Sequence, residues 1–103
     1  MSKDEAAIEA EIAEKGLTAP RLTPGHIDAV IEDEIYWNPA GTSLTICVLI
    51  LKNGFTVTGE SAAASNENFD PQIGMKIARQ NAREKIWALE GYLLRQRLFE
   101  GGV

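Results

Sequence analysis

Cysteine and histidine are almost absent from this chain, which has one of each, Cys47 and His26, among its 103 residues. A lone cysteine cannot form an internal disulfide, and one cysteine and one histidine far apart in sequence do not make a metal-binding cluster. The nine glycines form no phosphate-cradling loop, and no G-x-S-x-G nucleophile motif occurs. We therefore expect no catalytic site, no metal and no cofactor, with Cys47 as a buried, inert thiol.

Long apolar runs and clustered positive charge are also lacking. No run approaches the roughly 20 residues that a membrane span needs, and the first residues lack the basic and apolar regions of a signal peptide. The net charge is −5, which argues against binding to duplex nucleic acid. Residues 1–34 hold nine acidic and three basic side chains, whereas residues 35–103 hold six and seven. We expect a cytoplasmic protein with an acidic front end and neither a membrane nor a duplex as partner.

The strongest local signal is a β-hairpin around Asn53-Gly54. Residues 44–51 form an unbroken apolar run, and residues 55–58 alternate between apolar and polar. A two-residue turn at Asn53-Gly54 predicts two sets of strand pairs. The expected core face pairs Ile50 with Val57, Val48 with Gly59 and Ile46 with Ser61; the mixed face pairs Leu51 with Thr56, Leu49 with Thr58 and Cys47 with Glu60. Gly59 in a strand usually marks a bulge or the close approach of another backbone.

The remaining elements complete an α+β fold. Residues 32–37 predict a first strand, so the sheet is a three-stranded antiparallel meander. Thr23-Pro24 is typical of a helix start, and a short helix should follow it. Residues 1–20 predict an acidic, helical or frayed tail, and residues 23–99 a single domain.

A long helix is expected at the carboxyl end. Asp70 is placed as its N-cap with Pro71 at the first helical position, and Phe69 can pack back onto the first turns. The apolar side chains from residue 73 to residue 98 make a stripe wide enough to cover the sheet and leave apolar surface over. Gly91 is a position where this helix can kink or split, over residues 88–91. The surplus apolar surface predicts a homodimer or a higher homo-oligomer.

Two polar residues and a basic stripe are the candidates for binding. Glu60 is either buried and paired or at a sheet edge, and Asn81, beside the apolar face of the helix, makes either a helix–strand hydrogen bond or a ligand contact. Six of the ten basic residues lie between positions 76 and 97. They form either a solvated face, which the acidic front end can neutralise, or a site for a small anion. They are Lys76, Arg79, Arg83, Lys85, Arg95 and Arg97.

Three blocks of the chain resemble a known family. They read LKNGFTVTGESA at 51–62, NFDPQIGMKIARQNA at 68–82 and KIWALEGYLL at 85–94. Together they are similar to the small tailed-phage proteins of the "gene product forty-nine / sixty-six" family, over residues 23–98. Members often carry proline where this chain has Ala88. The resemblance implies a phage or prophage origin and an accessory role in the infected bacterial host, without implying a particular activity.

The layout of a small sheet followed by long helices is also similar to the Thoeris anti-defence proteins, phage proteins that trap a cyclic ADP-ribose signal between subunits. That similarity implies a non-enzymatic oligomer that sequesters a small phosphorylated nucleotide. By residue type, Phe69 would stack on a base, Asp70 and Asn81 would hydrogen-bond base or ribose, and Glu60 would lie nearby. Phosphates would meet Arg79, Arg83, Arg95 or Arg97. The alternative is a protein-interaction module that inhibits a host enzyme through its acidic amino terminus.

Overall fold

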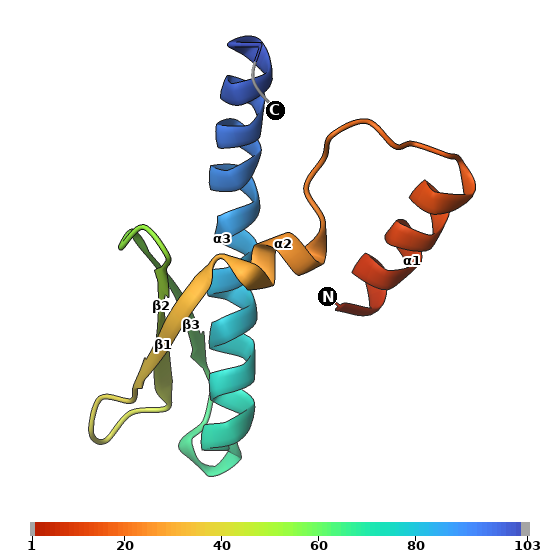
Figure 1. Ribbon diagram of the computed structural model, residues 1–103. Coiled ribbons are helices and arrows are strands. Elements are labelled where there is room, and N and C mark those ends of the chain that lie inside the picture. The colour runs from red at the N-terminus through yellow and green to blue at the C-terminus, as the bar shows by residue number, and fades with distance from the viewer. Residues whose placement is uncertain (1, 102–103) are drawn as a thin grey trace.

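The structure, a computed structural model, describes residues 2–101 (Figure 1). It confirms an α+β fold with a short helix, a three-stranded antiparallel sheet in the order β1-β2-β3, and one long carboxy-terminal helix. The elements in chain order are α1 (Ser2–Glu14), α2 (Pro24–Ala29), β1 (Ile31–Trp37), β2 (Leu44–Leu51), β3 (Thr56–Ala62), the 3-10 turn η1 (Asn66–Asn68) and α3 (Pro71–Phe99).

The core lies between α3 and one face of the sheet. The buried side chains are small or aliphatic. The hydrophobic effect, which favours their removal from water, stabilises this two-layer arrangement. The buried apolar residues are Ile27 of α2, Cys47, Leu49 and Leu51 of β2, Val57 of β3, and Ala78, Ala82 and Ile86 of α3. Burial raises the pKa of the Cys47 thiol, so this cysteine packs as a small apolar side chain.

The register of the hairpin corrects the sequence-based prediction. Ile50 pairs with Thr56 and Leu49 with Val57, one residue away from the expected pairs. The connection is a three-residue loop, in which the N–H groups of Leu51 and Gly54 bond to the carbonyls of Phe55 and Leu51 at 2.8 Å each. Gly54 adopts φ +90°, as such a loop requires.

A slip of one residue exchanges the two faces of a strand. The buried face of β2 is therefore Cys47 and Leu49, and the expected core residues Ile46, Val48 and Ile50 lie on the opposite, half-exposed face. The expected pair of Cys47 with Glu60 is also wrong, because Cys47 faces Gly59 and Glu60 faces Ile46.

Gly59 allows α3 to approach the sheet closely. A Cβ atom at this position would collide with the backbone oxygen of Ala78 and the backbone nitrogen of Ala82. The small side chains Ala78 and Ala82 lie at the same contact and are fully buried. Of the two interpretations of a strand glycine, a bulge or a close backbone approach, the second is confirmed.

α3 is one continuous helix of 29 residues, so the split considered at 88–91 does not occur. It begins at the expected N-cap, where Asp70 Oδ1 accepts hydrogen bonds from the N–H groups of Gln72 (2.9 Å) and Ile73 (3.1 Å). At about 1.5 Å per residue it is about 43 Å long, whereas the strands span about 25 Å. Its carboxy-terminal part therefore projects beyond the sheet, as Figure 1 shows.

Large apolar surfaces stay uncovered in one protomer. The face of the sheet away from α3 carries four half-exposed aliphatic residues of β2 beside Ile35 and Trp37, which are 51% and 60% exposed. On α3 the exposed apolar side chains include Ile73, Ile77, Tyr92 and Phe99. No helix within residues 2–101 combines the length and the apolar character needed to cross a membrane.

The close contact at Gly59 generates a prediction. Gly59→Ala should lower the free energy of unfolding by about 1–3 kcal/mol, because backbone atoms of α3 must move to admit the methyl group. Urea unfolding followed by far-ultraviolet circular dichroism measures this change. Gly91→Ala is the matched control, since a Cβ there meets only Leu22 Cδ1 at 3.8 Å and alanine should stabilise the helix by about 0.5–1 kcal/mol. Equal effects of the two substitutions would contradict this packing.

Candidate functional site

The best-formed aromatic hollow surrounds Phe69, at the amino-terminal end of α3. On one side of Phe69 lies a cavity of about 200 Å³. Three of the seven residues that line it are aromatic: the lining is Tyr36, Trp37, Asn38, Thr45, Phe69, Pro71 and Met75. A smaller cavity of about 110 Å³ lies on the other side and is lined in part by Asp70, Ile73 and Ile77.

The local sequence explains how Phe69 reaches this position. The turn η1 ends at Phe69, and Asp70-Pro71 then starts α3 directly, so the ring is held between the last turn and the first helical turns. Gly74 leaves room for it, because a Cβ on Gly74 would lie 3.4 Å from Phe69 Cε1 and 2.7 Å from Thr45 Oγ1. The Thr45 hydroxyl is buried without a hydrogen-bond partner. The predicted pair Phe69 and Asp70 is thus brought to one place, beside unpaired polar and aromatic groups.

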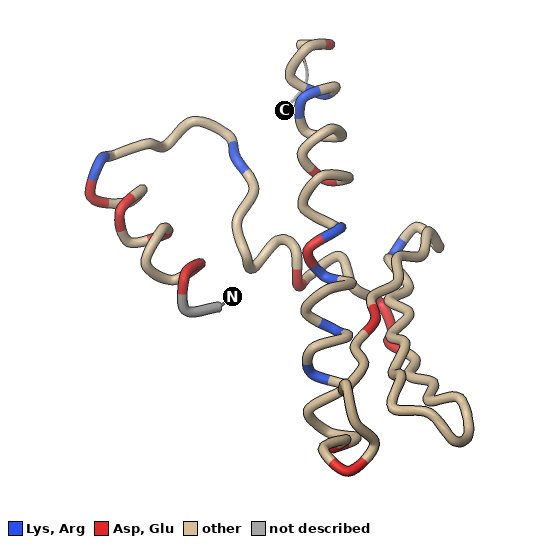
Figure 2. The backbone as a smooth tube through the Cα atoms, turned by 180° about the vertical axis from the view of Figure 1, so that it is seen from behind, with Lys and Arg blue, Asp and Glu red and all other residues tan. Residues whose placement is uncertain are grey.

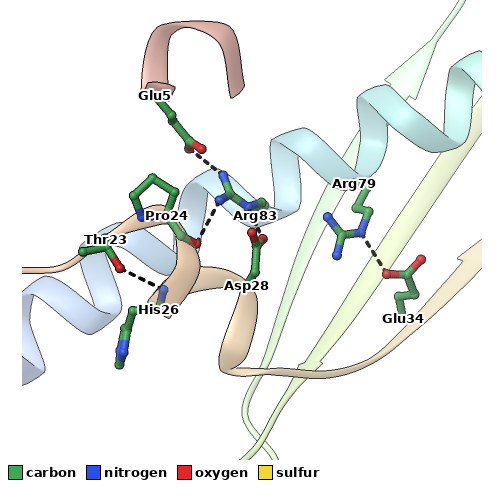
Figure 3. A network of polar contacts seen from close by, with 8 residues as sticks. All are labelled: Glu5, Thr23, Pro24, His26, Asp28, Glu34, Arg79 and Arg83. Carbon is green, nitrogen blue, oxygen red and sulfur yellow. Dashed lines mark hydrogen bonds and ion pairs between the residues drawn. The ribbon is translucent and has the colours of Figure 1, made fainter. Parts of the chain in front are cut away.

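A charged network borders this hollow through Tyr36. Arg79 Nε donates to Glu34 Oε1 at 2.8 Å, and the Tyr36 hydroxyl donates to Glu34 Oε2 at 2.9 Å (Figure 3 shows the Arg79–Glu34 pair). The hydrogen bond from Arg79 holds the pKa of Glu34 below its usual range. Burial and the bond to Glu34 raise the pKa of the Tyr36 hydroxyl, which therefore stays protonated. Arg79 lies near the hollow, but its guanidinium already has a carboxylate partner.

Arg83 joins three helices instead of facing the hollow. Its Nη1 lies 2.6 Å from Glu5 Oε2, its Nε donates to Asp28 Oδ1 at 2.7 Å, and its Nη2 donates to the carbonyl of Pro24 at 3.3 Å (Figure 3). The bond to Glu5 raises the pKa of Arg83 further. Of the two interpretations of the basic stripe, neutralisation by the acidic front end therefore applies to Arg83.

Asn81 makes the helix–strand hydrogen bond that was one of its two expected roles. Its Nδ2 donates to the backbone carbonyl of Glu60 at 2.8 Å. The side chain of Glu60 is exposed, which corresponds to the sheet-edge alternative. Asn81 is itself exposed, so its amide oxygen remains accessible.

Arg95 and Arg97 lie at the opposite end of α3 from Phe69. The 25 residues between Asp70 and Arg95 correspond to about 38 Å along a helix. Both arginines are exposed, and neither forms an ion pair with any residue from 2 to 101. One protomer therefore brings together Phe69, Asp70 and, through Tyr36, Arg79, but not Arg95 or Arg97.

The sequence analysis did not identify Tyr36 and Trp37 as parts of this site. They end β1, and their position beside Phe69 depends on the pairing of Tyr36 with Cys47 and Trp37 with Ile46. The signal that could have identified them is the short alternating segment at residues 32–37, which ends in these two aromatic residues. Between residues 2 and 101, no three His, Cys, Asp or Glu side chains lie close enough to hold a metal ion. What the arrangement offers is aromatic stacking surface, because Asp70 already caps the amino terminus of α3 and the donors Arg79 and Tyr36 are bonded to Glu34.

The Arg79–Glu34 pair predicts a pH dependence. Because the pKa of Glu34 is depressed in the folded state, the pair stabilises the fold above the ordinary carboxyl pKa of 4.5 and loses this effect as the pH falls through the folded value. Glu34→Gln should therefore cost up to about 1 kcal/mol near pH 7, since the pair is partly exposed, and less near pH 3. Urea unfolding at both pH values measures the difference, with Glu67→Gln as the control. An equal cost at both pH values would contradict the assignment.

Comparison with known proteins places the chain in a family. The model of the phage protein (N4 Gp49/phage Sf6 gene 66) family matches residues 22–98, which include α2, the whole sheet and most of α3. No curated protein and no solved structure matches the chain. The matched segment contains Phe69 and its surroundings, whereas α1 lies outside it. The chain belongs to the phage protein (N4 Gp49/phage Sf6 gene 66) family.

Proposed function

We propose that this phage protein is a non-catalytic accessory protein that captures a small nucleotide-derived signalling molecule of the bacterial host and so blunts a defence response. The observation that carries the proposal is the hollow around Phe69. Tyr36, Trp37 and Phe69 are among the residues that line it. Tyr36 lies on the sheet face that α3 covers, so Tyr36 and Phe69 supply the stacking surface, whereas Trp37 belongs to the opposite face and borders the hollow at the end of β1. Aromatic walls stack on any nucleobase, and base–aromatic stacking contributes about 1–3 kcal/mol per base.

The phosphate-binding part of such a site requires a second copy of the chain. The nearby Arg79 is paired with Glu34, and Arg95 and Arg97, which have no ion-pair partner among residues 2–101, are too far away in the same protomer. A second copy running antiparallel along α3 supplies them. The smaller cavity, which Phe69 also lines, would then lie at the seam between two protomers.

The side of α3 that is exposed in one protomer has the spacing for this pairing. Eight exposed residues fall within a sector of about 100° of the helix surface. They are Ile73, Ile77, Asn81, Glu84, Ala88, Tyr92, Arg95 and Phe99. The order is roughly symmetrical about residues 84–88, with apolar residues at both ends. Two copies crossing there place Ile73 opposite the second copy's Phe99, and Ile77 opposite its Arg95, next to the smaller cavity.

A second candidate function, inhibition of a host enzyme through the acidic front end, is favoured by one separate observation. α1 presents the exposed carboxylates Asp4 and Glu14 beside a cleft against the rest of the chain, whereas Glu5 and Glu9 pair with Arg83 and Arg21. Figure 2 shows the acidic residues along α1 and the basic residues along α3. This cleft is distinct from the hollow around Phe69.

Ligand capture is tested by heat stability and calorimetry. A panel of cyclic ADP-ribose isomers and cyclic dinucleotides should contain one member that raises the melting temperature and binds with measurable heat. Phe69→Ala should weaken that binding by about tenfold or more, because the stacking surface is lost. Phe55→Ala is the control, since Phe55 is 55% exposed in the hairpin loop and lies outside both cavities. A panel without any effect on stability would remove this proposal.

The antiparallel pairing of α3 gives a separate test. Light scattering should report about twice the 11.2 kDa mass of one chain, or a multiple of it. Ile77→Cys combined with Arg95→Cys should cross-link two chains under mild oxidation, whereas Lys76→Cys combined with Arg95→Cys should not, because Lys76 lies off the shared side. A monomer of 11.2 kDa in solution would contradict the two-copy site.

A further inference from the structure

The arm formed by α1 encloses a large cleft against the rest of the chain. Two ion pairs join α1 to later parts of the described chain: Glu5 with Arg83 at 2.6 Å, and Glu9 with Arg21 at 2.8 Å. Figure 1 shows α1 standing apart from the sheet and α3, at the end of a long connection. Between the two parts lies a cavity of about 470 Å³. This volume is within the range of about 300–1,000 Å³ typical of binding sites.

The floor of the cleft is apolar. Ile8 and Ile12 lie four residues apart on one side of α1, and Trp87 of α3 and Leu22 face them across the cavity. Ile8 is 54% exposed, although it is the largest apolar side chain in the middle of the arm. The apolar side of α1 therefore stays exposed to the cleft, where a bound partner could cover it.

The rim of the cleft is acidic on both sides. Asp4, Glu5 and Glu9 of α1 and Glu84 of α3 line it, against a single arginine, Arg21. Glu5 and Glu9 are neutralised by the ion pairs above, while Asp4 and Glu84 form no ion pair with any described residue. The rim thus carries a net negative charge that a phosphate or another acidic surface would meet unfavourably.

We propose that this cleft binds a basic amphipathic helix of a partner protein. An apolar channel between two helices accepts side chains at positions i, i+3 or i+4, and i+7 of a third helix, which is the usual mode of helix-in-groove recognition. Lysines or arginines flanking these anchors would meet Asp4 and Glu84. Trp87 lines the same cleft and adds apolar, aromatic surface for such a helix. The arm lies outside the residues 22–98 that match the family, so the inference is independent of the captured ligand.

The test uses the full chain and synthetic helical peptides of about 18 residues. The probe is a fluorescein-labelled peptide of leucine and lysine with a helical period. One control has glutamate in place of lysine, and a second has the same leucines and lysines in an order without an apolar face. Fluorescence anisotropy should show the probe binding at least about tenfold more tightly than either control, and the preference should weaken with added salt.

Matched variants assign the binding to the cleft. Ile8→Glu should weaken binding of the probe by about tenfold, whereas Ala13→Glu, on the same helix but away from the cavity, should leave it unchanged. Asp4→Lys should weaken binding, and Glu67→Lys, an equal change of charge outside the cleft, should not. Circular dichroism confirms that each variant is folded. These results together support the proposal.

Three outcomes would overturn it. The first is equal binding of the three peptides, or no binding. The second is equal loss of binding in the cleft variants and their controls, which would indicate attraction by net charge alone. The third is dissociation of a wild-type oligomer by Ile8→Glu with no binding of the probe, which would show that a second copy fills the cleft. None of these outcomes affects the ligand test at Phe69, so the two proposals fail separately.

Discussion

The close contact between the backbone of α3 and β3 is the constraint on which the rest of the structure depends. Gly59 has no side chain at the point where Ala78 and Ala82 of α3 pass over the sheet. Small residues on both sides let the helix lie low on the sheet and bury the short aliphatic core. With one helix against one sheet face, the other face of the sheet and the other side of α3 stay without a partner. The apolar surface that makes assembly attractive is therefore a result of this packing.

Much of the fold could be predicted because its signals are local. The pairs Thr23-Pro24 and Asp70-Pro71 start helices as expected, with Thr23 Oγ1 accepting from the N–H of His26 and Asp70 capping α3. The strand positions followed from the apolar run and the Asn53-Gly54 turn. The strand register could not be predicted in this way, because loops of two residues and of three residues both contain Asn-Gly. One additional loop residue shifts the pairing by one and exchanges the buried and exposed faces of β2. Gly59 was the better guide, since it marks the face on which the helix lies.

The candidate site could be predicted only in part. Phe69 and Asp70 are neighbours in sequence and their positions follow from the helix start, whereas Tyr36 and Trp37 reach them through strand pairing. The partners of the arginines are set by contacts between distant segments, such as Arg83 with Glu5 and Arg79 with Glu34. Charge patterning indicated that the acidic front end could neutralise the basic helix, but it could not say which arginines would be occupied. The division between paired and unpaired arginines comes from the three-dimensional structure.

The bonds of Arg83 determine how easily α1 can separate from the rest of the chain. The Arg83 side chain, 14% exposed, belongs to α3 and binds α1 through Glu5 and α2 through Asp28 and Pro24. Its bonds to α2 complete a compact unit, so the arm is fastened to that unit by the bond to Glu5 and to the connection before α2 by the pair of Glu9 with Arg21. Detaching α1, Ser2–Glu14, leaves the packed core in place, because the buried apolar residues belong to α2, the sheet and α3, and Arg83 keeps its bonds to α2. A segment fastened in this way can exchange its position between neighbouring molecules without unfolding either.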